Sequence, residues 1–157
     1  MKSSEVLLNQ VQENLDAFCH KQRSDFEAIS QDLVPVVDYT QSLLQGGKRF
    51  RALFCYWAWR GSLGQSVHQQ NQSEVLESED AIAGIAASLE MFHAAALVHD
   101  DLLDQSDTRR GAPAIHKRFE SLHKEKSWAG SPERFGVAGS VLVGDLMLGW
   151  SSEIFGN

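Results

Sequence analysis

Residues 81–98 read AIAGIAASLEMFHAAALV, an apolar run of 18 residues interrupted by Ser88, Glu90 and His93. The run is long enough to cross a bilayer. Ionisable groups are costly inside hydrocarbon, however, so Glu90 and His93 argue against a membrane span. A helix that is apolar on all sides is otherwise a core helix of a sizeable helical protein. We therefore expect an all-α fold built around this helix, and no membrane span.

An acidic cluster follows the apolar run, in residues 99–111, HDDLLDQSDTRRG. In a helix, Asp100 and Asp104 lie one turn apart, and Asp101 joins the same face. Carboxylates this close repel each other unless protons, basic groups or a metal ion offset their charge. Mg²⁺ is well suited, because it takes oxygen ligands and commonly links one or two carboxylates to a phosphate.

Two arginines, Arg109 and Arg110, come directly after the acidic cluster. Their planar guanidinium groups can bind phosphate oxygens through two hydrogen bonds. The combination predicts a site for magnesium and a diphosphate. An ordinary alternative is a solvated helix end whose loop forms ion pairs with it, since short motifs often occur without function.

A second basic motif, GGKRFR at residues 46–51, precedes a helix rich in aromatic residues. The two glycines allow the backbone to approach a ligand closely. Cations at a helix N-terminus are disfavoured unless an anion joins them, so the motif predicts a second phosphate site. Gly-Gly before basic residues is also common in surface turns, and the ending required for a Walker A loop is absent.

The remaining sequence predicts further helices and two long loops. Leu8, Val11, Leu15 and Phe18 follow helical spacing. A second helix is expected over residues 36–45 with Pro35 at its start. Polar and Gln-rich composition predicts a loop or insertion over residues 61–80, and breaker residues predict another over 121–132. Strand signals are scarce.

Composition restricts the classes of function. The net charge of −7 argues against nucleic-acid binding. Cys19 and Cys55 show no disulfide framework and are expected to be inert. We see no secretory signal, and we therefore expect a cytoplasmic protein.

From about residue 33 onward the chain resembles the N-terminal half of the trans-polyprenyl diphosphate synthases, geranylgeranyl diphosphate synthase-like members in particular. The matching pieces occur in the family's order and at family-like spacing. They are residues 46–51, Leu89-Glu90 with His93, residues 99–104, Arg109-Arg110-Gly111 with Pro113 and His116, and Gly144-Asp145. The resemblance implies an isoprenoid synthase-type helical bundle in which residues 1–157 form the N-terminal part of a single domain.

The resemblance also implies roles for individual residues. Isopentenyl diphosphate would be held by Lys48, Arg51, His93 and Arg110. Mg²⁺ on the allylic diphosphate would be held by Asp100, Asp101 and Asp104, with Arg109 on the same leaving group. His93 taken alone would be a buried structural histidine, but it lies two turns before Asp100 and therefore on the same face.

The implied reaction is a head-to-tail, trans condensation of isopentenyl diphosphate with an allylic diphosphate. Ionisation of the allylic carbon–oxygen bond would be assisted by Mg²⁺ and arginines. Ala95 and Ala96 leave room before the aspartates, and Phe92 stands one turn deeper as a possible floor. The expected product is geranylgeranyl diphosphate or longer. A homodimer is implied by the resemblance alone.

The family's second aspartate-rich motif does not occur in these 157 residues. We therefore expect a truncated synthase, and the sequence leaves open whether it is active or inactive in this form; the alternative is a non-catalytic or regulatory subunit of a heteromeric prenyl diphosphate synthase. A carboxylate-bridged metal protein of the helical-bundle type is a further alternative. It would need a second Glu-x-x-His pair beside Glu90 and His93.

Overall fold

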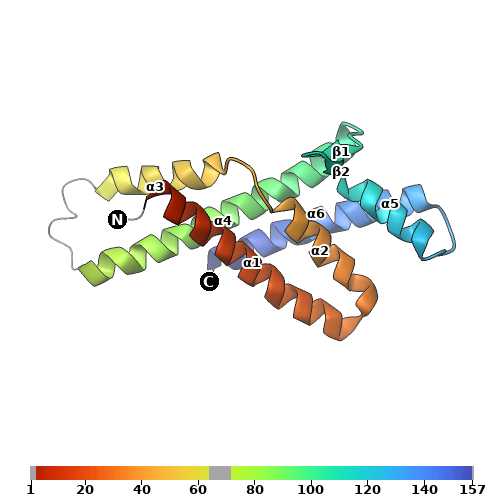
Figure 1. Ribbon diagram of the computed structural model, residues 1–157, viewed down its shortest axis with the longest axis horizontal. Helices are drawn as coiled ribbons and strands as arrows, with labels where there is room; N and C mark the ends of the chain where they lie inside the picture. Colours follow the sequence, from red (N-terminus) through yellow and green to blue (C-terminus); the bar gives the residue numbers. More distant parts are fainter. Residues whose placement is uncertain (1–2, 64–71, 157) are drawn as a thin grey trace.

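Helices make up nearly all of the computed structural model, which describes residues 3–63 and 72–156 (Figure 1). The elements are α1 (Ser4–Ile29), the short 3₁₀ helix η1 (Gln31–Leu33), α2 (Val34–Leu43), α3 (Phe50–Leu63), α4 (Gln72–Leu103), β1 (Thr108–Arg109), β2 (Ala112–Pro113), α5 (Ile115–Glu125) and α6 (Pro132–Gly156). The expectation of an all-α fold is confirmed, with one small hairpin added.

The apolar run forms the second half of α4, the central helix of the fold. This helix packs against α6, α3 and α1, so that apolar side chains on several of its sides are buried. Ala83, Ala87 and Met91 are fully buried. Because alanine side chains are small, these neighbouring helices can approach α4 closely and pack around it.

Two helices, α4 from Ser78 to Leu103 and α6, are apolar and long enough to cross a membrane by length and composition alone. The most apolar window of α4 is 56% buried inside the fold, and that of α6 is 33% buried. Core helices of globular proteins pass the same test, so this is weak evidence for a membrane protein.

The first helix begins with a cap and buries a stripe of four apolar residues. The Ser3 hydroxyl accepts the Val6 backbone N–H at 3.3 Å, which satisfies one of the free amides at the helix start. The buried stripe is Leu7, Val11, Leu15 and Cys19, spaced by four residues. The predicted positions Leu8 and Phe18 are partly buried at the edge of this stripe.

The two loops are shorter than the sequence predicts. Helix α3 continues to Leu63 and α4 starts at Gln72, so the loop prediction for 61–80 is wrong at both ends. Its middle, 64–71, lies outside the described residues. Polar residues near the start of α4 are held by other helices: the Tyr56 hydroxyl donates to Glu79 and the Gln10 amide donates to Asp80, each at 2.9 Å.

The loop expected over 121–132 is likewise restricted to the residues between α5, which ends at Glu125, and α6, which starts at Pro132. The last two turns of α5 are held by buried Phe119 and Leu122. The helix predicted over 36–45 is α2, displaced by two residues, with Pro35 in its first turn.

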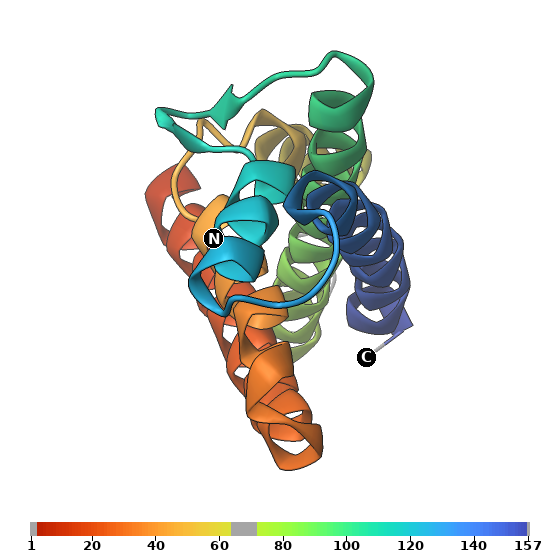
Figure 2. The same cartoon turned by 90° about the vertical axis from the view of Figure 1, so that its right-hand side faces the viewer.

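The β1–β2 hairpin and the connection between α2 and α3 lie on the same, upper side of the molecule (Figure 2), and Arg110 Nη1 donates to the Gln45 carbonyl between them. Both predicted phosphate motifs occupy these two segments. The fold therefore brings together residues 46–51 and 109–111, which are about 60 positions apart in the sequence.

Candidate diphosphate and magnesium site

The end of α4 is closed by a turn that redirects the chain. The Asp104 N–H donates to the Asp100 carbonyl at 2.8 Å, and the Ser106 N–H donates to the Asp101 carbonyl at 2.8 Å. Gln105 has a φ of 55°, the left-handed conformation that commonly ends helices. The acidic cluster thus lies on the last helical turn and the residue that follows it.

The two arginines are placed by the hairpin. Arg109 pairs with Ala112, which leaves Arg110 and Gly111 as the two-residue turn. Both turn residues have positive φ, 53° and 80°, as a type I′ hairpin requires. The tight turn folds Arg109 back onto the end of α4.

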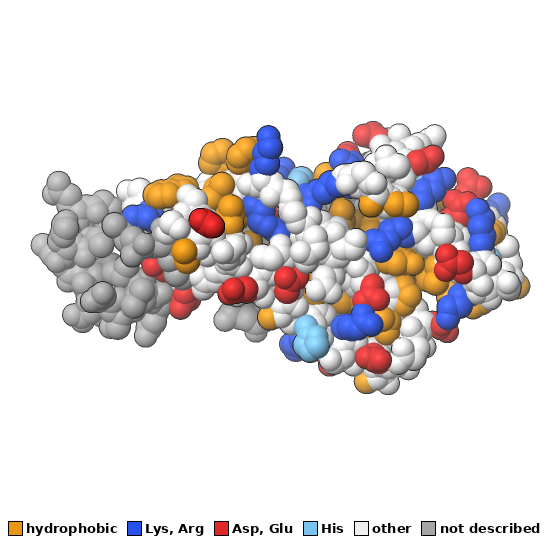
Figure 3. Space-filling view, viewed as in Figure 1, with side chains coloured by type: hydrophobic (Ala, Val, Ile, Leu, Met, Phe, Trp, Pro, Cys, Tyr) orange, Lys and Arg blue, Asp and Glu red, His pale blue; other side chains and the backbone are white. Residues whose placement is uncertain are grey.

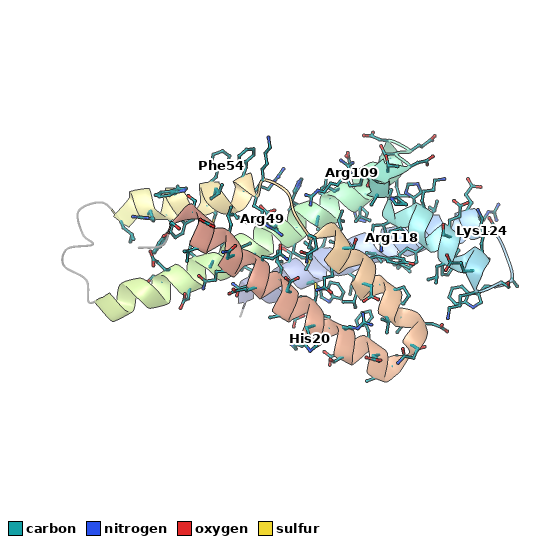
Figure 4. All side chains as sticks on the ribbon, in the orientation of Figure 1. His20, Arg49, Phe54, Arg109, Arg118 and Lys124 are labelled. Atoms are coloured by element: carbon teal, nitrogen blue, oxygen red, sulfur yellow. The ribbon has the colours of Figure 1, made fainter. Side chains whose placement is uncertain are left out.

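Arg109, which is labelled in Figure 4, binds the acidic cluster directly. Its Nε donates to Asp101 Oδ1 at 2.9 Å, its Nη2 donates to the same oxygen, and Nη2 donates to Asp100 Oδ2 at 3.3 Å. The hydrogen bonds to Asp101 are the main reason that the pKa of Arg109 is raised. Asp101 is 2% exposed, whereas the side chain of Asp100 is 53% exposed.

The sequence predicts one patch of three carboxylates; in the structure two of them, Asp100 and Asp101, bind the same Nη2 of Arg109 but differ in burial. Asp101 is buried against Arg109, and Asp100 and Asp104 are exposed. In the part of the chain that the structure describes, no three His, Cys, Asp or Glu side chains converge as a metal cluster requires. The physical reason is that an ion pair with Arg109 offsets the charge of Asp101 without a metal.

Magnesium still fits the two exposed carboxylates. Asp100 and Asp104 are one turn apart, and Mg²⁺ commonly uses one or two carboxylates, several waters and the oxygens of a phosphate. The donors are of the right type, and both side chains are accessible. These residues would hold the metal together with a diphosphate.

Gly47 of the basic motif makes room for Arg110. A Cβ on Gly47 would lie 3.1 Å from Arg110 Nη2, closer than most side chains come. Arg110 Nη1 donates to the carbonyls of Leu43 and Gln45, each at 3.1 Å. These contacts place Arg110 against Gly47 of the 46–51 segment. Its acceptors are neutral carbonyls, so no carboxylate offsets its charge through these contacts.

His93 lies in the electrostatic field of the arginines. Burial lowers its pKa, and the positive charges of Arg51, Arg110 and Arg109 lower it further, while Glu90 opposes them. A neutral histidine at pH 7 can either donate or accept a hydrogen bond. Lys48 is exposed, and its Nζ lies 5.8 Å from the centre of the Phe50 ring.

A space-filling view shows Lys and Arg side chains across the upper part of one face, with Asp and Glu side chains at its upper right (Figure 3). A sequence model described as polyprenyl synthetase matches residues 33–157, which include both basic motifs and the acidic cluster. The chain belongs to the polyprenyl synthetase family.

Individual members of this family are similar over half of the chain or more. A farnesyl diphosphate synthase of Haemophilus influenzae is 29% identical over 149 residues, covering 94% of this chain and 40% of the relative. Geranylgeranyl pyrophosphate synthase 11, a chloroplastic protein of Arabidopsis thaliana, is 41% identical over 81 residues, which are 50% of this chain and 19% of the relative. Heptaprenyl diphosphate synthase component 2 of Geobacillus stearothermophilus is 33% identical over 118 residues, 72% of this chain and 33% of the relative.

A solved structure confirms that the fold is that of the family. The geranylgeranyl pyrophosphate synthase of Corynebacterium glutamicum, crystallised with isoprenyl diphosphate and magnesium, superposes with a TM-score of 0.80 and 33% identity. The match covers 95% of this chain and 40% of that structure. The chain thus spans about two fifths of the length of this synthase and of the Haemophilus influenzae farnesyl diphosphate synthase.

The three residues predicted to set product length do not share one face of this synthetase-family chain. Ala95 is fully buried in the core, whereas Ala96 is exposed and Phe92 is 55% exposed. Consecutive helical residues are rotated by about 100°, so Ala95 and Ala96 cannot both line one groove equally. Phe92 and Ala96, four residues apart, remain together on the exposed face of α4.

Sequence reasoning assigned no role to three residues that lie at the site. Arg118 lines a cavity of about 140 Å³ with Arg109 and Arg110, and its Nη1 donates to the Ser42 hydroxyl at 3.0 Å. Arg49 and Glu90 form a buried ion pair behind the basic motif. The sequence carries a signal for the pair, because Arg49 precedes an apolar segment and Glu90 interrupts another, but it carries none for Arg118.

Proposed function

We propose that this chain carries the diphosphate-binding half of a prenyltransferase that condenses isopentenyl diphosphate with an allylic diphosphate, head to tail and in trans. The observation that carries the proposal is the meeting of residues 46–51, His93 and Arg109-Arg110 beside the exposed carboxylates of Asp100 and Asp104. Cationic and carboxylate groups that lie close together suit a diphosphate with a divalent cation. Family membership supports the same reaction class.

Two anion subsites would use different groups of this chain. Lys48, Arg51, His93 and Arg110 would bind isopentenyl diphosphate. The Nη1 hydrogen bonds of Arg110 go to backbone carbonyls, so no carboxylate offsets its charge through these contacts. Arg109 would bind the leaving allylic diphosphate beside Asp100. Its guanidinium already donates to Asp101, which keeps its orientation fixed.

Catalysis in this proposal is electrostatic. Magnesium, when bound, would offset the charge that develops on the departing diphosphate. Arg109 would donate hydrogen bonds to that leaving group, and Arg110 with Arg51 would hold the second substrate so that its double bond faces the allylic carbon. The new carbon–carbon bond forms as the allylic cation is attacked, and loss of a proton gives an allylic product.

The product is proposed to be geranylgeranyl diphosphate or longer. Phe92 lies about two turns before Asp100 on an exposed face of α4, where a growing chain that follows the helix would reach it. Phe92→Ala should lengthen the product. Leu103 lies between Asp101 and Asp104, on the other side of Asp100 from Phe92 in the sequence, so Leu103→Ala should leave the product length unchanged. An unchanged product distribution in the Phe92 variant would rule out this floor.

A homodimer in the cytoplasm is proposed as the working form. The alternative is a non-catalytic or regulatory subunit of a heteromeric synthase, and the similarity to a protein named as a synthase component favours testing it. This alternative predicts that the chain is inactive alone and changes the product length of a partner synthase.

The test of the proposed reaction is incorporation of labelled isopentenyl diphosphate into extractable product by the purified chain, with farnesyl diphosphate and Mg²⁺. Incorporation that disappears in Asp100→Asn supports the prenyltransferase. No incorporation by a folded chain contradicts catalysis by this chain alone.

A further inference from the structure

A buried ion pair lies directly behind the basic motif. Arg49 Nη1 is 3.5 Å from Glu90 Oε2, and each side chain is only 7% exposed. The other carboxylate oxygen, Glu90 Oε1, accepts the Ala52 backbone N–H at 3.3 Å. The carboxylate of α4 therefore binds both the side chain of the motif and the first turn of α3.

The remaining donors of Arg49 reach two further parts of the fold. Nη2 donates to the side chain of Gln12 in α1 and to the carbonyl of Leu44 at the end of α2. Figure 4 shows Arg49 in the middle of the bundle, between α1 and α4. One guanidinium thus connects α1, α2 and α4, while its backbone leads into α3.

The backbone of Arg49 is held in an unfavourable conformation. Its φ is 46°, in the left-handed region that residues with a Cβ seldom adopt. Such conformations persist where the surrounding contacts over-determine them, and they occur often at binding sites. The hydrogen bonds of the Arg49 side chain provide those contacts.

The groups proposed to bind isopentenyl diphosphate are attached to both ends of this pair. Lys48 precedes Arg49, and Arg51 is two residues after it. His93 follows Glu90 by one helical turn, and the charge of Arg51 acts on it. Any shift between Arg49 and Glu90 would therefore move Lys48 and Arg51 relative to His93.

We propose that Arg49 and Glu90 are positioning residues that fix Lys48 and Arg51 opposite His93 for diphosphate binding, without contacting the ligand themselves. This inference rests on the proposed function. A positioning role can be separated from a purely structural one by substitution. A buried ion pair can often be replaced by uncharged residues without loss of stability, so a loss of binding in a folded variant would report on positioning.

The test is titration calorimetry of inorganic diphosphate into the full 157-residue chain and into Arg49→Met/Glu90→Gln. This double substitution leaves the net charge unchanged and retains an oxygen acceptor for the Ala52 N–H. We expect the variant to stay helical by circular dichroism and to bind diphosphate at least tenfold more weakly. The control, Lys21→Met/Glu153→Gln, removes an exposed pair at 3.2 Å between α1 and α6 and should bind normally.

A second comparison separates positioning from stability. Arg51→Gln should weaken diphosphate binding strongly in the native chain, but little further in the Arg49/Glu90 variant, because Arg51 is no longer held in place. Equal losses in the two backgrounds would overturn the inference, as would native affinity in a folded double variant.

A double variant that fails to fold is replaced by Arg49→Lys, which keeps the charge but lacks the planar fork that reaches three partners. Native affinity in Arg49→Lys would also overturn the inference. If the native chain binds no diphosphate, the proposed function fails together with the inference. If it binds and these variants bind equally well, only the inference fails.

Discussion

Asp100 and Asp101 are adjacent in the sequence but have different surroundings. Asp101 is buried and bound by Arg109, whereas Asp100 is half-exposed and within 3.3 Å of the same guanidinium. The acidic cluster and the arginines could be found from the sequence by their residue types. The sequence could not tell that Arg109 would bind Asp101 and Asp100 together, because that depends on the hairpin turn at Arg110 and Gly111.

Substituting these two aspartates should separate stability from binding. Asp101→Asn should reduce the free energy of unfolding by about 1–3 kcal/mol, since it leaves Arg109 without its buried partner. Asp100→Asn should change it by less than about 0.5 kcal/mol, as exposed ion pairs do, but weaken binding of magnesium diphosphate. Urea unfolding and calorimetry measure the two effects. Equal losses of stability would contradict these different roles.

His93 provides a pH-dependent test. Burial and the nearby arginines lower its pKa, so its stability contribution is present above about pH 6.5, the unfolded value, and is lost as the pH falls through the lower folded value. A bound diphosphate should raise this pKa and cause proton uptake. Calorimetry near pH 6 in two buffers of different ionisation enthalpy should show more proton uptake for the native chain than for His93→Gln. An identical proton count would contradict binding at His93.

At the level of elements, long apolar helices were predicted better than the polar segments between them. The 81–98 run predicts α4 because hydrophobicity alone makes it a core helix. Its polar first turns were predicted as loop because the partners of Glu79 and Asp80 come from α3 and α1, which no local pattern reveals. The two-residue strands have too few residues to show alternation.

Two glycines of α6 test how closely α5 and α6 pack. A Cβ on Gly136 would lie 2.4 Å from the His116 carbonyl oxygen, whereas a Cβ on Gly149 would have no neighbour within 4 Å. Gly136→Ala should lower the free energy of unfolding by about 1–3 kcal/mol through overpacking. Gly149→Ala should raise it by about 0.5–1 kcal/mol through helix propensity. The close contact between α5 and α6 would be contradicted if thermal or urea unfolding showed a higher free energy of unfolding for both variants than for the native chain.

For the whole molecule, the family and fold class follow from the motifs, but the state of association does not. Three apolar side chains on neighbouring turns of α6 are exposed, Val137 at 45%, Val141 at 41% and Leu142 at 68%. Exposed apolar patches commonly mark interaction surfaces. In the sequence these three residues resemble core positions, so their exposure can be recognised only in the folded structure.

We expect this patch to promote self-association of the chain. Leu142→Glu should shift the population toward monomer in sedimentation velocity, because burying a carboxylate at an apolar contact is costly. Ile29→Glu changes an equally exposed residue at the end of α1 and should have no effect. Association that is unchanged by Leu142→Glu would exclude the α6 patch as the contact surface.

The central claim is that residues from distant segments form one binding site for isopentenyl diphosphate. The most direct measurement is calorimetric titration of isopentenyl diphosphate, without Mg²⁺, into the native chain and into Arg51→Gln and Arg110→Gln. We expect one site per chain and at least a tenfold loss of affinity in each variant, as removal of a charged hydrogen-bond donor commonly causes. No binding by the folded native chain, or native affinity in both variants, would contradict the claim.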